Sequence, residues 1–173
     1  MLSQERPQPP LYFFFPLSLF LNIVTNNLPC QRSNQVYANF NLKVGSYNIQ
    51  GQGAKNQVKL RKIKNLFNKG SFDILLIQES RTDGCEKELK NWRKIFNSKQ
   101  IYLTNFGTQS VGAGIIVRNE EYFKVHHSFL DPLGRYVGIV GDHEDVKFLI
   151  ISVYSPSIEL EIKNFVIIGF IGS

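Results

Sequence analysis

Residues 72–80 read FDILLIQES, a run of four aliphatic side chains followed by glutamine and glutamate. The aliphatic residues at 74–77 need burial on both faces, as in a strand at the centre of a covered sheet. Glu79 then places a negative charge at the rim of that sheet, where desolvation is costly without a cation or a hydrogen-bond donor. Taken alone, the pattern fits equally well a strand that simply reaches solvent at Glu79.

Strands and helices alternate around this run from position 42 onward. The patterns predict strands at 42–48, 72–80, 112–118, 122–129, 136–140 and 146–154, and helices at 57–68 and 86–96. The side chains expected to face the core are Leu60, Ile63, Leu66 and Phe67 in the first helix and Leu89, Trp92 and Phe96 in the second. Residues 141–145 (GDHED) are expected to form the tight turn of the last hairpin. This order predicts an α/β sandwich, two sheets with helices outside.

The length of 173 residues suits one domain, and its net charge of +6 is unevenly placed. Between positions 43 and 99, thirteen lysines and arginines accompany five acidic residues. This surplus fits a solvated helix face, but it also indicates a polyanionic partner such as DNA, bound through phosphate contacts. The candidate DNA contacts are Lys55, Lys59, Arg61, Lys62 and Arg81.

The first 41 residues have a different composition, with a proline-rich start and an apolar run at 11–24. The run is too short, and too interrupted by Pro16, for a stable membrane span. We interpret it first as a disordered or spurious extension, because its codons resemble a pyrimidine tract. A signal peptide is the second interpretation, since Glu5 beside Arg6 and the lack of a small-x-small cleavage site argue against it. A membrane anchor is the third. The expected partial domain covers residues 42–173.

The two cysteines, Cys30 and Cys85, fit neither a metal-ligand spacing nor a disulfide framework. A reducing compartment, nuclear or cytoplasmic, is therefore expected, with secretion as the alternative if residues 11–24 are a signal peptide. No protein partner can be inferred, and a monomer is expected.

Three predicted strands end in a polar side chain: Asn48, Glu79 and Tyr154. If these ends lie along one edge, the edge presents an amide, a carboxylate and a phenol. A carboxylate with vacant oxygens suits Mg²⁺, which takes one or two protein carboxylates and completes its shell with water and phosphate. An amide and a phenol can donate hydrogen bonds to phosphate oxygens.

Four segments in order carry a resemblance to a known family: VGSYNIQG (44–51), DILLIQE (73–79), GAGIIV (112–117) and IISVYSPS (150–157). They resemble the endonuclease/exonuclease/phosphatase superfamily, which is DNase I-like. The sequence GRY at 134–136 is most similar to the endonuclease domains of non-LTR retrotransposons. The resemblance implies a DNase I-like two-sheet fold and Mg²⁺- or Mn²⁺-dependent phosphodiester hydrolysis on DNA.

The same resemblance implies the roles of three residues. Glu79 would be a ligand of the catalytic Mg²⁺ or Mn²⁺, and Asn48 would lie beside the metal and the scissile phosphate. Tyr154 would donate a hydrogen bond to the phosphate or help to position the attacking water. The metal would act as a Lewis acid.

The chain also departs from the family pattern. The family continues with a Gly-Asp-x-Asn strand and an Asp-His pair, whereas this sequence has Phe170 where the aspartate is expected and stops at Ser173. We therefore expect a truncated domain with weak metal binding and impaired turnover. The alternatives are a secreted DNase-like nuclease and a non-catalytic DNA-binding remnant of a retroelement.

Two histidine-containing segments do not supply the missing groups. Asp142-His143 is expected in a hairpin turn, upstream of the tyrosine motif, and His126-His127 has no metal-ligand spacing. Neither pair is predicted to be catalytic.

Overall fold

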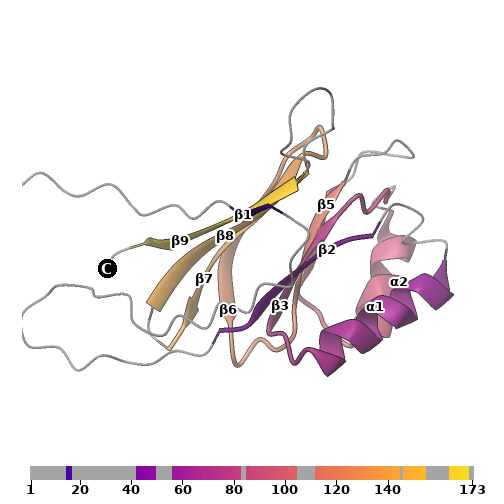
Figure 1. Ribbon diagram of the computed structural model, residues 1–173, viewed down its shortest axis with the longest axis horizontal. Helices are drawn as coiled ribbons and strands as arrows, with labels where there is room; N and C mark the ends of the chain where they lie inside the picture. Colours follow the sequence, from indigo (N-terminus) through magenta and orange to yellow (C-terminus); the bar gives the residue numbers. More distant parts are fainter. Residues whose placement is uncertain are drawn as a thin grey trace, which may run out of the picture.

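The computed structural model describes residues 42–49, 56–82, 85–104, 112–144 and 146–154, and the backbone of residues 15–16 and 164–171. In these ranges the chain forms three layers: a five-stranded sheet, a four-stranded sheet and two helices (Figure 1). Both helices, α1 (Gln57–Lys69) and α2 (Glu86–Phe96), cover the outer face of the four-stranded sheet. The expected α/β sandwich of two sheets with helices outside is confirmed.

The four-stranded sheet contains the run at 72–80. Its strand order is β2 (Val44–Asn48), β3 (Ile74–Gln78), β5 (Ala113–Val117) and β4 (Ile101–Leu103). Strands β2 and β3 are parallel, whereas β5 is antiparallel to both β3 and β4. All five residues of β3 are buried, because the helices cover one face of the sheet and the second sheet covers the other. Strand β4 was not predicted, since three residues are too few to show a periodic pattern.

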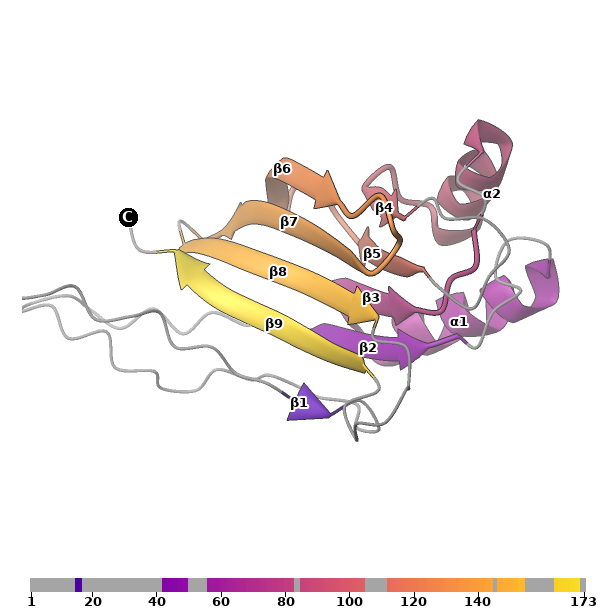
Figure 2. The same cartoon turned by 90° about the horizontal axis from the view of Figure 1, so that it is seen from above.

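The five-stranded sheet is antiparallel throughout. Its order is β1 (Phe15–Pro16), β9 (Asn164–Ile171), β8 (Val146–Tyr154), β7 (Tyr136–His143) and β6 (Lys124–Leu130) (Figure 2). The remainder of the expected extension, residues 1–14 and 17–41, lies outside the described residues, as does the cysteine at position 30.

The prediction of a turn at 141–145 was wrong for its first three residues. Strand β7 continues through His143, which pairs with Val146, and Glu144 adopts the left-handed conformation typical of a tight turn. The imidazole of His143 is buried, and its Nδ1 is 2.8 Å from the backbone oxygen of Tyr122. The Tyr122 ring packs against it at 4.5 Å. Packing against the β5–β6 connection therefore overrides the polar composition of this segment.

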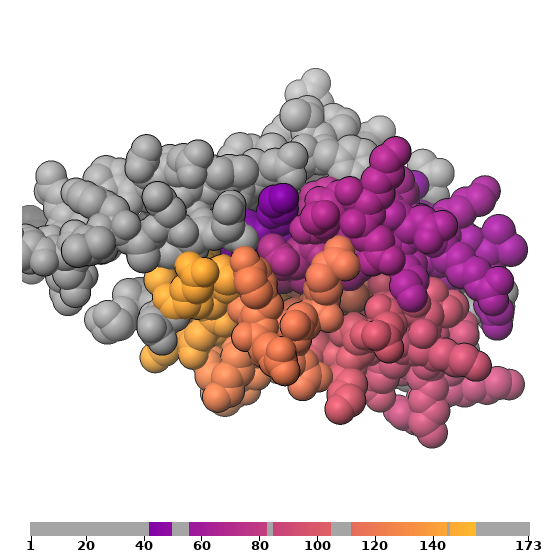
Figure 3. Space-filling model, turned by 90° about the horizontal axis from the view of Figure 1, so that it is seen from below, coloured from indigo at the N-terminus to yellow at the C-terminus, as the bar shows by residue number. Residues whose placement is uncertain are grey.

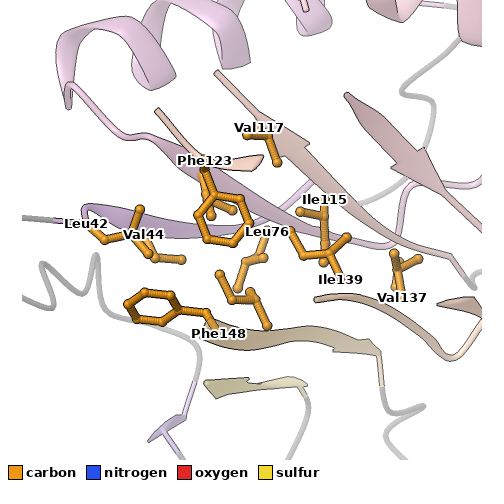
Figure 4. Packing of buried hydrophobic residues seen from close by; sticks show 12 residues of the cluster. Leu42, Val44, Leu76, Ile115, Val117, Phe123, Val137, Ile139 and Phe148 are labelled. Carbon is orange, nitrogen blue, oxygen red and sulfur yellow. The ribbon is translucent and has the colours of Figure 1, made fainter. Parts of the chain in front are cut away.

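Two apolar clusters hold the layers together. One lies between the sheets and includes Leu76, Ile115 and Phe148 (Figure 4). The other lies between the four-stranded sheet and the helices and is centred on Trp92.

The helices follow their predicted bounds closely but differ in which side chains they bury. Leu66 is 40% exposed, contrary to the prediction, whereas Leu89 is half-buried and packs against the core between the helices and the sheet, as expected. Glu88 on α2, which was not predicted to face the core, is buried as well. The buried face of α2 thus contains, besides Trp92 and Phe96, a polar side chain that hydrophobicity alone does not indicate.

Candidate functional site

The ends of β2 and β3 lie side by side, because the two strands are parallel and Asn48 pairs with Gln78 (Figure 2). Glu79 follows directly after β3. The side-chain nitrogen Nδ2 of Asn48 donates a hydrogen bond to Oε1 of Glu79 over 2.9 Å. The structure thus brings together two of the three strand-end residues that the sequence singled out.

A buried polar bridge joins the end of β8 to the end of β3 across the two sheets. Nε2 of Gln78 donates to Oγ of Ser152 over 3.2 Å and to Oγ of Ser46 over 3.1 Å. The Ser152 hydroxyl in turn donates to the backbone oxygen of Ile77 over 3.0 Å. Since side chains two residues apart in a strand share a face, the bridge also directs Tyr154 toward the ends of β2 and β3.

Tyr154 lies in the electric field of Glu79. Burial, with 8% of the residue exposed, raises the pKa of its phenol above 10.0. The negative charge of Glu79 raises this pKa further, and the positive charge of Arg81 lowers it. The phenol is therefore protonated at neutral pH and can donate a hydrogen bond to an anionic ligand.

The turn after β3 has an unusual backbone. Glu79 and Arg81 have φ angles of 53° and 46°, in the left-handed region that ordinary residues seldom adopt. The intervening Ser80 is fully buried, and its backbone nitrogen donates to the backbone oxygen of Gly112 over 3.1 Å. Nη2 of Arg81 lies 3.9 Å from Oε2 of Glu79. Such strained conformations cluster at functional sites.

The sequence analysis missed a loop that supports Tyr154. In the β6–β7 turn, Oδ2 of Asp131 accepts hydrogen bonds from the backbone nitrogen of Arg135 over 3.0 Å and from its Nε over 2.7 Å. The backbone oxygen of Arg135 then accepts a 2.6 Å hydrogen bond from the backbone nitrogen of Tyr154. The spacing Asp-Pro-Leu-Gly-Arg, typical of a turn closed by its first side chain, could have revealed this loop.

This ion pair keeps Asp131 ionised at a lower pH than an ordinary aspartate. Its side-chain hydrogen bond with Arg135 is the main cause that lowers its pKa from 3.8 to about 2, although burial opposes the shift. A lowered carboxyl pKa stabilises the fold fully above the unfolded value of 3.8, and this contribution disappears as the pH falls through about 2.

Asp131→Asn is therefore expected to lower the free energy of unfolding by about 1 to 2 kcal/mol at pH 7, because charge-assisted hydrogen bonds are lost. Urea unfolding at pH 7, 4 and 2 tests this, and the difference from wild type should shrink toward pH 2. The exposed Glu121→Gln is the matched control, with an expected change within about 0.5 kcal/mol. A difference that is constant from pH 7 to pH 2 would contradict the ion-pair explanation.

The predicted DNA contacts that the structure describes lie in two separate regions. Lys59, Arg61 and Lys62 lie on α1, which falls in the purple part of Figure 3. Arg81 instead lies beside Glu79 at the end of the sheets. Lys55 lies outside the described residues.

The two histidine pairs lie far from this end of the sandwich. His126 pairs with Asp142 across β6 and β7, at the opposite end of the sheet from Tyr136 and Tyr154. Contrary to prediction, Asp142 and His143 belong to a strand and not to a turn. Both pairs therefore lie at the end of the five-stranded sheet away from Tyr154.

Position 170 does not lie where the sequence comparison suggested. Strand β9 is antiparallel to β8, with Asn164 opposite Tyr154 and Phe170 opposite Phe148, so β9 points away from the site (Figure 2). Only residues 155–163 connect the two strands, whereas a parallel pair needs a crossover of roughly a dozen residues or more. The short connection thus imposes the antiparallel register and carries position 170 to the other end of the sheet.

The donor set at the site fits a magnesium-like cation held mainly by substrate and water. Glu79 supplies a partly exposed carboxylate and Asn48 an amide, and Mg²⁺ commonly uses only one or two protein carboxylates. In the described ranges, no group of three or more His, Cys, Asp and Glu side chains is arranged to hold a metal ion. Nor does that part of the chain contain a helix long and apolar enough to cross a bilayer.

No protein-family model matches the chain, and no curated protein matches it significantly. Among solved structures, TDP2 from Caenorhabditis elegans is similar, with 20% identity, a TM-score of 0.49, and coverage of 67% of this chain and 36% of that one. A truncated TDP2 from the same organism has 18% identity, a TM-score of 0.49, and coverage of 67% and 47%. The selenomethionine form has 19% identity, a TM-score of 0.48, and coverage of 67% and 35%. This chain thus spans less than half the length of these structures.

Proposed function

We propose that the end of the sandwich at Asn48, Glu79 and Tyr154 binds a divalent cation, Mg²⁺ or Mn²⁺, and a phosphodiester of DNA. The proposed reaction is metal-dependent phosphodiester hydrolysis. The 2.9 Å hydrogen bond from Asn48 to Glu79, at the shared end of two parallel strands, is the observation that carries the proposal. The four DNase I-like sequence motifs support it, and the GRY segment at 134–136 favours the retrotransposon branch.

Each residue has a distinct part in this proposal. Asn48 fixes the orientation of the Glu79 carboxylate, which would hold the cation. When bound, the cation would supply Lewis-acid activation and neutralise charge on the phosphate. Tyr154, whose raised pKa keeps the phenol protonated above pH 10 as well as at neutral pH, would donate its O–H to a phosphate oxygen.

Turnover by this chain is proposed to be slow. A general base must lie within hydrogen-bond reach, directly or through one water, of the proton that it removes. In the described part of the chain, the histidines lie on β6 and β7 toward their far ends, and position 170 also lies away from Tyr154. The expected behaviour is therefore cation and DNA binding with weak nicking.

Replacing Glu79 with glutamine tests the cation site directly. Mn²⁺ binding, followed by electron paramagnetic resonance of the free ion, should weaken roughly tenfold in Glu79→Gln, because the ligand loses its charge. Glu86→Gln removes an equivalent charge from an exposed ion pair on α2 and should change the affinity less than about twofold. Unchanged Mn²⁺ affinity in Glu79→Gln would rule out the proposed site.

The same two variants separate the enzyme from a non-catalytic DNA binder, which the exposed Arg61 and Lys62 on α1 favour. Any nicking of supercoiled plasmid in Mg²⁺ should disappear in Glu79→Gln and persist in Glu86→Gln. Salt-sensitive DNA binding with no Glu79-dependent nicking would identify a binding remnant.

We propose that the protein acts as a monomer on nuclear or cytoplasmic DNA. Secretion remains the alternative if residues 11–24 are a signal peptide, and an intact amino terminus on protein isolated from cells would exclude it.

A further inference from the structure

We propose that Arg81 pairs with Glu79 as its counterion until a divalent cation binds Glu79. The cation then displaces Arg81 from the carboxylate, and the guanidinium can bind a phosphate of the nucleic acid. This inference rests on the proposed function. It assigns Arg81 a positioning role at the cation site, in addition to its predicted contact with DNA.

Both carboxylate oxygens of Glu79 have partners in the described structure. Oε1 accepts the hydrogen bond from Asn48 over 2.9 Å, and Oε2 faces Nη2 of Arg81 at 3.9 Å. A cation that binds Glu79 therefore has to share or replace one of these partners. Arg81 is the easier one to replace, because 3.9 Å is much longer than the roughly 2.7 to 2.9 Å of a tight charge-assisted hydrogen bond.

The backbone keeps Arg81 close to Glu79 although the ion pair is loose. Both residues have left-handed φ angles, and the buried Ser80 between them is hydrogen-bonded to Gly112. Holding two ordinary residues in this conformation costs conformational energy, which the surrounding structure has to offset. The turn thus fixes a positive and a negative side chain side by side at the end of the sheet.

The charge of Arg81 also acts on the third residue of the site. It lowers the pKa of Tyr154, whereas burial and the charge of Glu79 raise it, so Arg81 and Glu79 act with opposite sign on the phenol that is proposed to contact the phosphate. The side chain of Arg81 is 33% exposed and that of Glu79 is 22% exposed, so solvent and a ligand can approach both.

Mn²⁺ titrated into the intact 173-residue chain tests the competition between Arg81 and the cation. Arg81→Gln should bind Mn²⁺ about three- to tenfold more tightly than wild type, because a competing positive charge has been removed. Arg81→Lys, which retains the charge, should lie closer to wild type. Arg93→Gln is the matched control: it breaks the 3.5 Å pair with Glu86 on α2 and should change the affinity less than twofold.

A second measurement follows Arg81 to the nucleic acid. Binding of a short duplex DNA, measured by fluorescence anisotropy in EDTA and in Ca²⁺, should tighten when the cation is added, because cation and DNA are linked through the same site. In Arg81→Gln this cation-dependent gain in DNA affinity should be at least about threefold smaller, because the variant has no guanidinium to bind the phosphate.

Equal or weaker Mn²⁺ binding in Arg81→Gln would overturn the inference, as would a gain in DNA affinity equal to that of wild type. An increase in Mn²⁺ affinity in Arg81→Lys as large as that in Arg81→Gln would also overturn the inference. These failures differ from failure of the proposed function, which would show as Mn²⁺ affinity unaffected by Glu79→Gln.

Discussion

Gly112→Ala is expected to destabilise the protein by about 3 kcal/mol and to weaken Mn²⁺ binding at the same time. Gly112 has a φ of 128°, a conformation that residues with a side chain strongly disfavour. A Cβ atom at this position would lie 2.3 Å from Oγ of Ser80 and 3.0 Å from the backbone nitrogen of Arg81. The substitution therefore strains its own backbone and pushes on the turn that carries Glu79.

Urea unfolding and Mn²⁺ titration of the same preparations test both parts of this prediction. Ser80→Ala is the partner variant, because the buried Ser80 hydroxyl has no hydrogen-bond partner in the described part of the chain, and its loss should change stability by less than about 1 kcal/mol. In the Ser80→Ala background, Gly112→Ala should cost about 1 kcal/mol less, since one clash is relieved. A fully additive double variant would show that the contact with Oγ does not matter.

The relation between Asn48 and Glu79 could be predicted from the sequence for a physical reason. A run of aliphatic residues that ends in a polar side chain marks the end of a buried strand, and the ends of parallel strands meet at one edge of a sheet. Strand, helix and strand follow one another from Val44 to Gln78, which is the order that produces a parallel pair. The contact over 2.9 Å follows from that topology.

The bridge that places Tyr154 could not be predicted in the same way. Gln78 and Ser152 are 74 positions apart, and each alone is an ordinary polar residue near the end of a strand. Only the packing of one sheet on the other buries both and makes them partners. The role of Asp131 could not be predicted either. Asp131 holds Arg135, and the backbone oxygen of Arg135 accepts the hydrogen bond from the backbone nitrogen of Tyr154.

Predictions from local composition were wrong where tertiary contacts had a larger effect on the backbone conformation than the local sequence. Gly141, Asp142 and His143 have the composition of a turn, yet they extend β7 because the His143 ring is covered by Tyr122. At position 170 the error came from the motif resemblance, which suggested a place at the same end of the sheet as Tyr154. The short connection between β8 and β9 instead places this residue opposite Phe148, at the other end of β8. In both cases the decisive information is non-local.

Trp92 dominates the second core, and its removal should have the largest effect on stability. The side chain is fully buried between the helices and the four-stranded sheet, and it stacks on Phe96 with a centroid distance of 5.6 Å and an interplanar angle of 12°. Trp92→Ala should lower the free energy of unfolding by about 3 to 5 kcal/mol, because it removes a large apolar surface and leaves a cavity. Since Trp92 is the only tryptophan, unfolding has to be followed by far-ultraviolet circular dichroism.

Trp92→Phe separates the volume of the side chain from its polar atom. The buried Nε1 of Trp92 has no hydrogen-bond partner in the described part of the chain, so phenylalanine removes an unfavourable donor along with some apolar volume. The expected cost is about 1 to 2 kcal/mol, well below that of alanine. Val58→Ala on the 64% exposed position of α1 is the control and should lie within about 0.5 kcal/mol of wild type. A phenylalanine variant as unstable as the alanine variant would show instead that Nε1 is bonded in solution, and would make the indole nitrogen a necessary contact of α2.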